Sequence, residues 1–468
     1  MTATLESLAT CFQGLLPAQL FTCSSDGIPN SAYLSHVDYV DPEHVALSFQ
    51  FFNKSRRNIA ENPQALVFVI DPDSGQGWSL RLRYERSETS GPLFERMALR
   101  IEAIASYCGL KGIFKLRAAD VYRVLSIEPV AEEAGSGRAA DSAARKPLEP
   151  VFTLTALQNL SERIHRAECL ETLVDSILAG LDESFGFKHS MIAVPAEQEG
   201  VLVTIATRGY PENGAGAEVR FGEGICGMVA EARKPIRISG LMRGMLYALA
   251  MHKAQTVPNA EPQAVRRARQ IRVPGLENPE SQLGIPLLVR GELVGVLCLE
   301  SEVPYRFHEE DKASIELLGS YLAIAIQNMQ WQERAADTVG ESVADNSQNA
   351  ANTVVAANAP AAAHRFVYYQ ADECMLLDDD YLIRGLPARI LWRLLTIREA
   401  TGREEFTNRE LRLDKSLNLP DWKDNLESRL LLLRRRLEQK CPHVRIAPRS
   451  RGRFGLRVEG PIALIAQP

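Results

Sequence analysis

FGEGICGMVAEARKPIRI at Phe221–Ile238 and SQLGIPLLVRGELVGVLCLES at Ser281–Ser301 decide the fold of the central part of the chain. The second stretch holds two runs of strand-forming residues around a turn at Arg290-Gly291-Glu292, which predicts a hairpin. The first stretch has a Gly-x-Gly-x-x-Gly spacing, but it lacks the strand-before, helix-after context and the ribose-binding acid of a dinucleotide site. Its glycines instead predict a tight turn before a short helix.

Helical and strand patterns surround these two stretches in a definite order. Apolar residues recur at helical spacing in Phe152–Phe185 and in His308–Gln332, and strand signals lie at His189–Pro195 and Val201–Thr207. In this order the block resembles a GAF domain over residues 151–332. The resemblance implies an antiparallel sheet with flanking helices, a pocket for a small-molecule effector, and helices that pair across a dimer.

The segment Ser239–Gln282 is expected to close that pocket. By the resemblance, the pocket lies between the sheet and this segment, whose length suggests a lid or a binding element. Packing methionines, a surface histidine and a solvated basic face are the simpler interpretation of its side chains. The sequence therefore leaves the ligand open and predicts no metal site. The side chains that could touch a ligand are Met242, Met245, Tyr247, Met251, His252 and the basic run Arg266–Arg272.

Length and composition divide the chain into three domains. Its 468 residues are too many for one hydrophobic core. Residues 131–150 and 333–363 are poor in bulky core residues and cannot bury enough apolar area to offset chain entropy, so they are predicted linkers. We therefore predict an α+β, multidomain chain with domains at residues 1–130, 151–332 and 364–468.

The spacing of the cysteines and the length of the apolar runs limit the class of protein to which the chain can belong. The eight cysteines are scattered without a Cys-x-x-Cys spacing, which argues against a zinc ribbon or a disulfide framework and predicts buried thiols. No run of about 18 apolar residues and no secretory signal are present in the sequence. We predict a cytoplasmic protein that does not bind membranes.

Short strand-forming runs dominate residues 1–130, and two helical patterns lie among them. Many short strands with two small helices predict a closed barrel. On the residues Ser24–Asn30, Ala46–Ser48 and Asn53–Asn58, the block resembles the pyridoxamine-phosphate-oxidase-like split barrel family. The strand runs are Ala18–Ser24, Ser31–Tyr39, His44–Phe51, Ala65–Asp71, Ser79–Ser87 and Ala119–Glu128, and the helical patterns are Ser55–Asn62 and Gly91–Ile104.

The split-barrel resemblance implies an FMN site at a dimer interface. A helix N-terminus with a cation and a hydroxyl group suits a phosphate, although the same residues also fit a capped helix start with solvated cations. The second strand, Asn30–Ser35, lacks the basic pair of the oxidases, so no catalytic residue is predicted. The resemblance assigns the phosphate to Lys54, Ser55 and Arg56, and the neighbourhood of the ring to Ser35 and Ser48.

NLESRLLLLRRRLEQKCPHVRIAPRSRGRFGLRV at Asn425–Val458 is a basic segment in an acidic chain. About ten Lys and Arg lie between Arg429 and Arg457 against one acid, Glu438, while the chain has a net charge of -6. The pattern predicts an amphipathic helix followed by a two-stranded ribbon. Positive charge of this local density favours contact with a polyanion.

Residues 364–468 resemble the winged-helix output domain of response regulators. A helical pattern at Pro387–Ala400 and a capping-box start at Thr407–Glu410 precede the basic helix and ribbon. In that family the third helix enters the major groove of double-stranded DNA and the ribbon touches the backbone. Asn and Arg can read base edges, while Ser and Arg can hold phosphate. The resemblance therefore assigns DNA contacts to Asn425, Ser428, Arg429, Arg435 and Arg436 on the helix and to Arg449, Arg451 and Arg453 on the ribbon.

Together these patterns predict a homodimeric one-component transcription regulator. Split-barrel and GAF domains would sense a small ligand or redox state, and the winged helix would bind DNA. Leu431 and Leu432 stand where the winged-helix family usually has polar or basic residues, and exposed leucines fit either a thymine methyl group or a protein interface. Two other functions stay open: a flavin-dependent oxidoreductase with regulatory modules, and a scaffold whose third helix binds protein.

Overall fold

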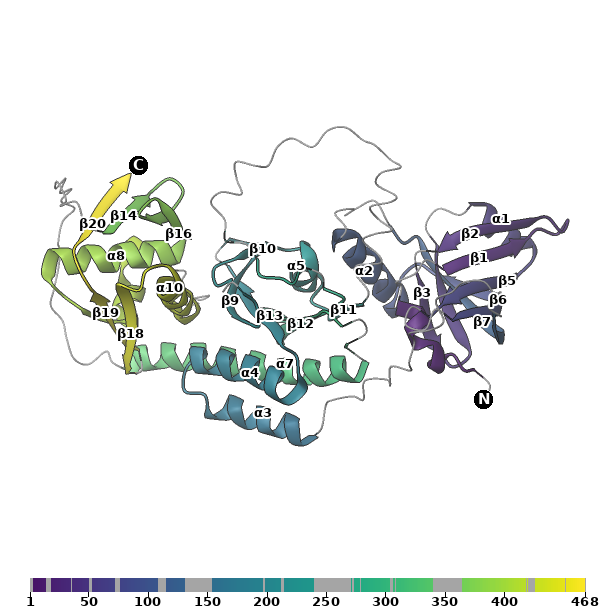
Figure 1. Ribbon diagram of the computed structural model, residues 1–468, viewed down its shortest axis with the longest axis horizontal. Coiled ribbons are helices and arrows are strands. Elements are labelled where there is room, and N and C mark those ends of the chain that lie inside the picture. The colour runs from purple at the N-terminus through teal and green to yellow at the C-terminus, as the bar shows by residue number, and fades with distance from the viewer. Residues whose placement is uncertain are drawn as a thin grey trace.

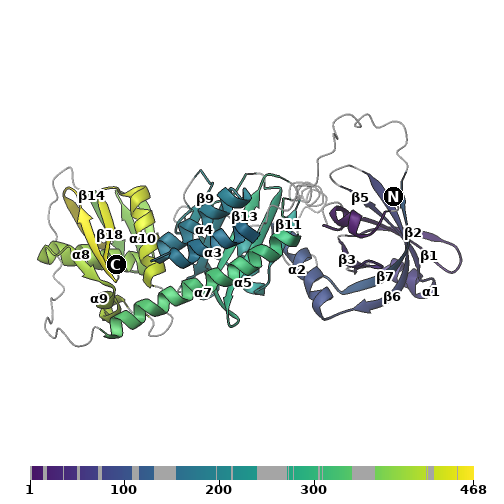
Figure 2. The ribbon, with the colours of Figure 1, turned by 90° about the horizontal axis from the view of Figure 1, so that it is seen from below.

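A computed structural model arranges the chain as three blocks in a row (Figures 1 and 2). We refer to residues 3–130 as the N-terminal block, 154–339 as the central block and 364–467 as the C-terminal block. The described residues are 3–13, 18–34, 36–49, 53–71, 76–107, 115–130, 154–196, 198–211, 214–239, 271, 273–277, 279–303, 306, 307, 309–339, 364–417, 419, 426–450 and 452–467.

The N-terminal block is built on a seven-stranded sheet with the strand order β2-β1-β5-β6-β7-β4-β3. The predicted single strand Ser31–Tyr39 is wrong, because β2 pairs with β1 whereas β3 pairs with β4, so its two halves lie at opposite ends of the strand order. The elements are η1 (Glu6–Gln13), β1 (Ala18–Cys23), β2 (Pro29–Leu34), β3 (Val37–Asp41), β4 (His44–Phe49), α1 (Asn53–Glu61), β5 (Gln64–Ile70), β6 (Gly77–Glu88), α2 (Pro92–Tyr107) and β7 (Ala118–Pro129).

The central block is a six-stranded antiparallel sheet, ordered β10-β9-β8-β13-β12-β11, with helices on both faces. Ile192 and Val194 of β8 pack with α3, α4 and α7, whereas Met191 and Ala193, which alternate with them, pack with α5. The predicted hairpin is confirmed as β12 paired with β13. The elements are α3 (Leu154–Arg166), α4 (Leu170–Phe185), β8 (His189–Pro195), β9 (Val201–Arg208), β10 (Glu218–Arg220), α5 (Gly224–Ala232), β11 (Ile236–Ser239), β12 (Ser281–Val289), β13 (Glu292–Ser301) and α7 (Glu309–Val339).

The helical pattern Phe152–Phe185, predicted as one helix, is two helices. The chain leaves the helix after Arg166, and Cys169 begins α4, where its backbone N–H donates to Thr172 Oγ1 at 3.3 Å. A Cβ on Gly180 would lie 2.0 Å from Leu160 Cδ1, so the absence of a side chain at Gly180 lets α3 fold back closely onto α4. Apolar spacing alone could not show this break, because both helices bury the same kind of face.

Cys226 on α5 and Cys298 on β13 form a disulfide with Cα atoms 6.3 Å apart. The prediction of buried thiols is therefore wrong for this pair. The two residues are separated by 72 positions, and they meet only because α5 packs against the face of the sheet that β13 presents. The other cysteines in the described residues are outside this disulfide, and they are buried at Cys374 and Cys441 and half-buried at Cys11, Cys23 and Cys169.

The C-terminal block packs three helices against two small sheets, ordered β16-β15-β14-β20 and β17-β19-β18. The expected basic helix and ribbon are present as α10 and the antiparallel pair β18 and β19. The last strand, β20, runs parallel to β14 and was not predicted. The elements are β14 (His364–Tyr369), β15 (Cys374–Leu377), β16 (Asp380–Arg384), α8 (Leu386–Thr401), β17 (Glu405–Thr407), α9 (Asn408–Leu413), η4 (Lys415–Leu417), α10 (Leu426–Lys440), β18 (Val444–Ser450), β19 (Arg453–Val458) and β20 (Ile462–Gln467).

Candidate functional site

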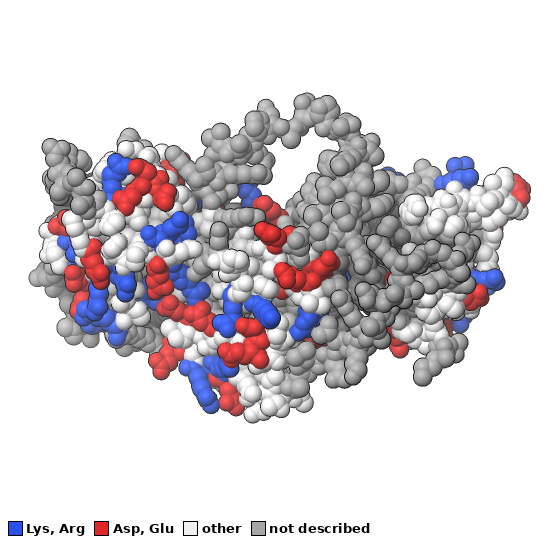
Figure 3. All heavy atoms as spheres, viewed as in Figure 1, with Lys and Arg blue, Asp and Glu red and all other residues white. Residues whose placement is uncertain are grey.

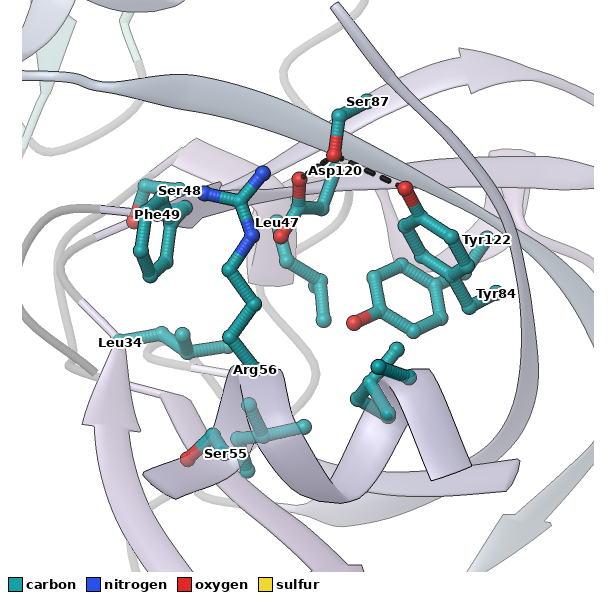
Figure 4. A pocket seen from close by; sticks show the side chains of 13 residues that line it. Leu34, Leu47, Ser48, Phe49, Ser55, Arg56, Tyr84, Ser87, Asp120 and Tyr122 are labelled. Carbon is teal, nitrogen blue, oxygen red and sulfur yellow. Dashed lines mark hydrogen bonds between the residues drawn. The ribbon is translucent and has the colours of Figure 1, made fainter. Parts of the chain in front are cut away.

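A small cavity in the N-terminal block brings together three of the residues that were predicted to hold FMN (Figure 4). Ser48 on β4 and Ser55 and Arg56 on α1 line a cavity of about 100 Å³. Lys54 is exposed at the start of α1 and does not line it, and Ser35 lies outside the described residues. The other polar lining residues, on β6 and β7, are Tyr84, Ser87, Asp120 and Tyr122.

Both serines of the cavity are engaged in hydrogen bonds within the block. Ser55 Oγ accepts a hydrogen bond from Asn30 Nδ2 at 2.9 Å, and Ser48 Oγ accepts one from the backbone N–H of His36 at 3.1 Å. Arg56 extends into the cavity, with its guanidinium carbon 4.4 Å from the centroid of the Phe49 ring. Arg56 is therefore the group best placed to attract an anion, while the serines fix the elements around it.

Asp120 is the residue of this cavity that sequence reasoning missed. Its carboxylate accepts a hydrogen bond from Ser87 Oγ, which also lies 2.9 Å from the hydroxyl group of Tyr84. Burial raises the pKa of Asp120, and the hydrogen bond from Ser87 and the charge of Arg56 act against that rise. A charged carboxylate here repels a phosphate, whereas a protonated one can donate to it. A single acid within a strand pattern gave no signal of a site.

Asp120→Asn is expected to raise the melting temperature of the N-terminal block at neutral pH but not in acid. A carboxyl group whose pKa is raised by folding contributes stability that is complete below its unfolded pKa, about 3.9, and is lost as the pH rises through the folded pKa. The asparagine side chain does not ionise, so the variant does not lose this stability as the pH rises. Calorimetry between about pH 3 and about pH 8 measures the difference. Glu43→Gln, at an exposed acid in the turn between β3 and β4, is the control. An equal effect at both ends of the range contradicts the prediction.

In the central block, a buried carboxyl group lies near the end of β13. Glu300 accepts hydrogen bonds from Gln282 Nε2 at 2.6 Å, from the backbone N–H of Leu276 at 2.9 Å and from the hydroxyl group of Tyr210 at 3.3 Å. Burial raises the pKa of Glu300, and these hydrogen bonds act against the rise. Gln282 Oε1 is buried and has no hydrogen-bond partner among the described residues. This polar cluster is a candidate for recognising an effector.

The side chains that were predicted to contact a ligand from the segment Ser239–Gln282 lie outside the described residues. They are Met242, Met245, Tyr247, Met251, His252 and, apart from Ile271, the run Arg266–Arg272.

The helix α10 is buried on every side from Ser428 to Leu437. Its inner side, with Leu430 and Leu433, belongs to a hydrophobic cluster formed mainly by the C-terminal block, to which Val203 and Ala215 of the central block also belong. Its outer side packs on the central block, where Leu431, 1% exposed, belongs to the cluster that α3, α4 and α7 form with the sheet. The central block therefore covers the side of the helix that was predicted to face DNA.

Oppositely charged side chains form ion pairs across this interface. Arg434 Nη1 lies 3.0 Å from Glu171 Oε2, and Arg435 Nη2 lies 2.5 Å from Asp175 Oδ1, both acids being on α4. Arg429 Nη2 donates to the carbonyl oxygen of Pro195 at 3.0 Å. In Figures 1 and 2, α10 lies on the side of the C-terminal block that faces the central block. Sequence reasoning missed Arg434 and both acids.

A second ionic link joins the two blocks beside a shared cavity. Arg384 Nε on β16 donates to Glu218 Oε1 on β10 at 2.6 Å, and burial lowers the pKa of Arg384. The cavity has a volume of about 360 Å³, within the range of about 300–1,000 Å³ of ligand pockets. Its lining includes Arg429 and Leu432 of α10 as well as this ion pair, so the interface is incompletely packed there.

The remaining residues that were assigned to DNA fall into different surroundings. Arg436 Nε donates to the carbonyl oxygen of Leu382 at 2.7 Å, within its own block, and burial lowers the pKa of Arg436. Ser428 is fully buried. Arg449 and Arg453 are exposed on the ribbon, with Arg449 paired to Glu405. Asn425 and Arg451 lie outside the described residues.

The charged surface of these two blocks is mixed in sign. In Figure 3, basic and acidic side chains alternate over the C-terminal and central blocks, without a uniform basic face in that view. The cations on this face therefore have acids near them.

Comparison with known proteins identifies the central block. Residues 167–327 match the family model of the GAF domain, a class of domain that binds small molecules. No curated protein matches the chain. Within the described part of the chain, no helix is long and apolar enough to span a membrane, and no group of three or more His, Cys, Asp and Glu side chains could hold a metal ion.

Three solved structures are each similar to a part of this chain. The GAF domain of an Acinetobacter phosphoenolpyruvate-protein phosphotransferase is 19% identical, with 38% of this chain and 94% of that chain covered and a TM-score of 0.29. Free methionine-R-sulfoxide reductase from Neisseria meningitidis is 18% identical, with 39% and 95% covered and a TM-score of 0.30. An FMN-binding protein from Syntrophomonas wolfei is 17% identical, with 28% and 89% covered and a TM-score of 0.24.

Proposed function

We propose that this protein is a transcription regulator in which the GAF domain senses a small molecule and the C-terminal block is a winged helix that binds DNA. The observation that carries the proposal is the direct docking of the arginine-rich helix α10 on the GAF domain. A sensor and a basic helix that share an interface can influence each other without an intermediate element. The order of α9, α10 and the ribbon β18–β19 agrees with this assignment.

The ribbon supplies the exposed part of the DNA-binding surface. Arg445, Arg449, Arg453 and Arg457 are exposed on β18 and β19, and phosphate contacts made by such side chains weaken with salt. Titration of the intact protein against a mixed-sequence duplex of about 30 base pairs, from about 0.05 to about 0.3 M salt, tests the proposal. The logarithm of the binding constant is expected to fall linearly with the logarithm of the salt concentration. The same titration is made with Glu171→Gln combined with Asp175→Asn, which removes two ion pairs between α10 and the GAF domain. No binding at the lowest salt by either protein would exclude the DNA-binding function.

We also propose that α7 pairs two copies of the chain. Leu317, Tyr321, Ile324 and Trp331 are between 46% and 50% exposed and recur at four-, three- and seven-residue spacing. This spacing places them in one stripe along the outer side of a 31-residue helix. A stripe of this kind pairs with its own copy about a two-fold axis, which buries both apolar faces.

Leu317→Arg combined with Ile324→Arg is expected to convert the dimer into a monomer, because the charges would be buried at the centre of the stripe. Sedimentation of the intact protein measures the change. Leu125→Arg makes the same change at a leucine of β7 that is 51% exposed and serves as the control. A wild-type protein that sediments as a monomer at micromolar concentration contradicts this prediction.

A second candidate function is FMN binding by the N-terminal block as a split barrel. The gathering of Ser48, Ser55 and Arg56 at one cavity supports it. Because the cavity is below the size of about 300 Å³ that is usual for a whole ligand, it suits the phosphate group alone, and the ring would lie outside. A flavin absorbance spectrum of the purified protein, lost in Arg56→Ala, supports this function or a flavin-dependent oxidoreductase. A colourless protein that takes up no added FMN contradicts both.

A further inference from the structure

We propose that the outer side of α10 is a single surface for two alternative partners, the GAF domain and DNA, so that docking on the GAF domain blocks DNA binding. The outer side comprises the residues that contact the GAF domain: Arg429, Leu431, Leu432, Arg434 and Arg435. The inference rests on the proposed function and adds how that function is controlled.

The guanidinium groups of α10 that bind the GAF domain are also the groups that would contact DNA. Arg429 and Arg435 are two of the arginines that the family resemblance assigned to DNA, and they are 4% and 8% exposed in this structure. Their guanidinium groups donate to the carbonyl oxygen of Pro195 and to Asp175, where a phosphate or a base edge would have to lie. Leu431, between them, is inserted into the hydrophobic cluster of the GAF domain. A duplex groove, which must receive the helix along its length, therefore cannot reach α10 in the docked state.

The GAF domain presents acidic side chains to α10, in the place that the phosphates of DNA would take. Glu171 and Asp175 are four positions apart on α4, so their side chains lie on one face about one turn apart. They meet Arg434 and Arg435, two neighbouring arginines of α10. The complementary charge favours this docked pair in the same way that phosphates would favour the released helix.

The docked state has features that allow release. The side chains of Asp175 and Glu171 are 59% and 29% exposed, so water and salt weaken their ion pairs. Ser428 Oγ and Arg434 Nε are buried without a hydrogen-bond partner in the described part of the chain, a cost that water or phosphate would remove. The cavity beside Arg384 and Glu218 leaves part of the interface unpacked. The interface therefore combines ion pairs that favour the docked state with buried polar groups and a cavity that disfavour it. Such a balance is required of an element that changes between a docked and a released state.

The test changes only the GAF side of the interface. Glu171→Gln combined with Asp175→Asn removes the two ion pairs between α10 and α4 and leaves every arginine of α10 in place. The probe is a mixed-sequence duplex of about 30 base pairs at about 0.05 M salt. We expect the intact variant to bind it about tenfold more tightly than the wild type, a typical coupling between two sites.

The control makes the same charge change away from the interface. Glu162→Gln combined with Glu183→Gln alters acids of α3 and α4 that pair with Arg166 and Arg163 within the GAF domain. It corrects for the loss of two negative charges, and its affinity is expected to match that of the wild type. Adding Arg435→Gln to the interface variant is expected to abolish the gain, because that arginine then serves neither partner.

The outcomes separate this inference from the proposed function. Tighter binding by the interface variant alone supports the shared surface. Equal affinities of wild type, interface variant and control overturn it and leave the DNA-binding function standing. Failure of all proteins to bind the duplex rules out the proposed function, and the inference with it. Melting curves that match the wild type confirm that the variants are folded.

Discussion

Leu431→Asp is expected to separate the C-terminal block from the GAF domain while both remain folded. Leu431 is 1% exposed and packs into the GAF cluster rather than into the cluster of its own block. A carboxylate at this position would be buried beside Arg435, which already pairs with Asp175. Burying a charge without a partner costs about 3–5 kcal/mol, a cost that detachment avoids. Because about 1.4 kcal/mol is a factor of ten in an equilibrium constant, the detached form becomes the main one.

Small-angle X-ray scattering of the intact protein measures this separation as a larger radius of gyration. Leu433→Asp provides a matched control two positions further along α10, where the leucine is fully buried in the C-terminal block's own cluster. That variant is expected to lose the melting transition of the C-terminal block. An unchanged radius for Leu431→Asp, or the loss of that transition in it, would contradict the prediction.

Local pattern was enough to predict the elements whose partners are near in sequence. The hairpin of β12 and β13 follows from two apolar runs around Arg290-Gly291-Glu292, and the GAF assignment of this part of the chain is confirmed. The helix α10 and its ribbon likewise follow from apolar spacing and from the turn that separates β18 from β19. In each case the physical determinant, a face of side chains or a turn, is contained in a short stretch.

Contacts between distant segments left little trace in the sequence. Glu171 and Asp175 have the spacing of any solvated helix face, so nothing marked them as the counterparts of Arg434 and Arg435. The pairing of β20 with β14 and the Cys226–Cys298 disulfide depend in the same way on how elements pack. Only Leu431 and Leu432 gave a signal, since leucines on the outer side of a basic helix predict either a thymine contact or a protein interface. The structure places both at a protein interface within the same chain.

The cavity of the N-terminal block likewise combines residues that were predicted from the sequence with one that was not. Ser48, Ser55 and Arg56 were all assigned through a family resemblance, and for Ser55 and Arg56 a hydroxyl group and a cation at a helix start agreed with it. Asp120 was missed because its importance comes from the cavity that β7 and α1 both line, where a buried acid lies near Arg56. Sequence reasoning can therefore supply the cation of a site and overlook the acid that limits which anion it accepts.

Arg449→Ala combined with Arg453→Ala is expected to weaken binding to the duplex on the order of 50-fold at about 0.1 M salt. Both side chains are exposed on the ribbon, where the GAF domain does not cover them. Each lost phosphate contact reduces the slope of log K against log salt by about 0.9, so the double variant has a slope shallower by about 1.8. Arg449 has to give up its ion pair with Glu405 to bind a phosphate, so Arg453→Ala alone is expected to cost more than Arg449→Ala alone.

A matched pair of exposed arginines separates ribbon contacts from a general effect of charge. Arg123→Ala combined with Arg166→Ala removes the same charge from β7 and α3, at side chains that are 52% and 81% exposed, and is expected to change neither affinity nor slope. Because phosphate contacts carry no sequence information, the loss in the ribbon variant is expected to be equal on unrelated duplexes. A loss confined to one sequence would instead place these arginines on base edges, and an unchanged slope would remove the ribbon from the DNA-binding surface.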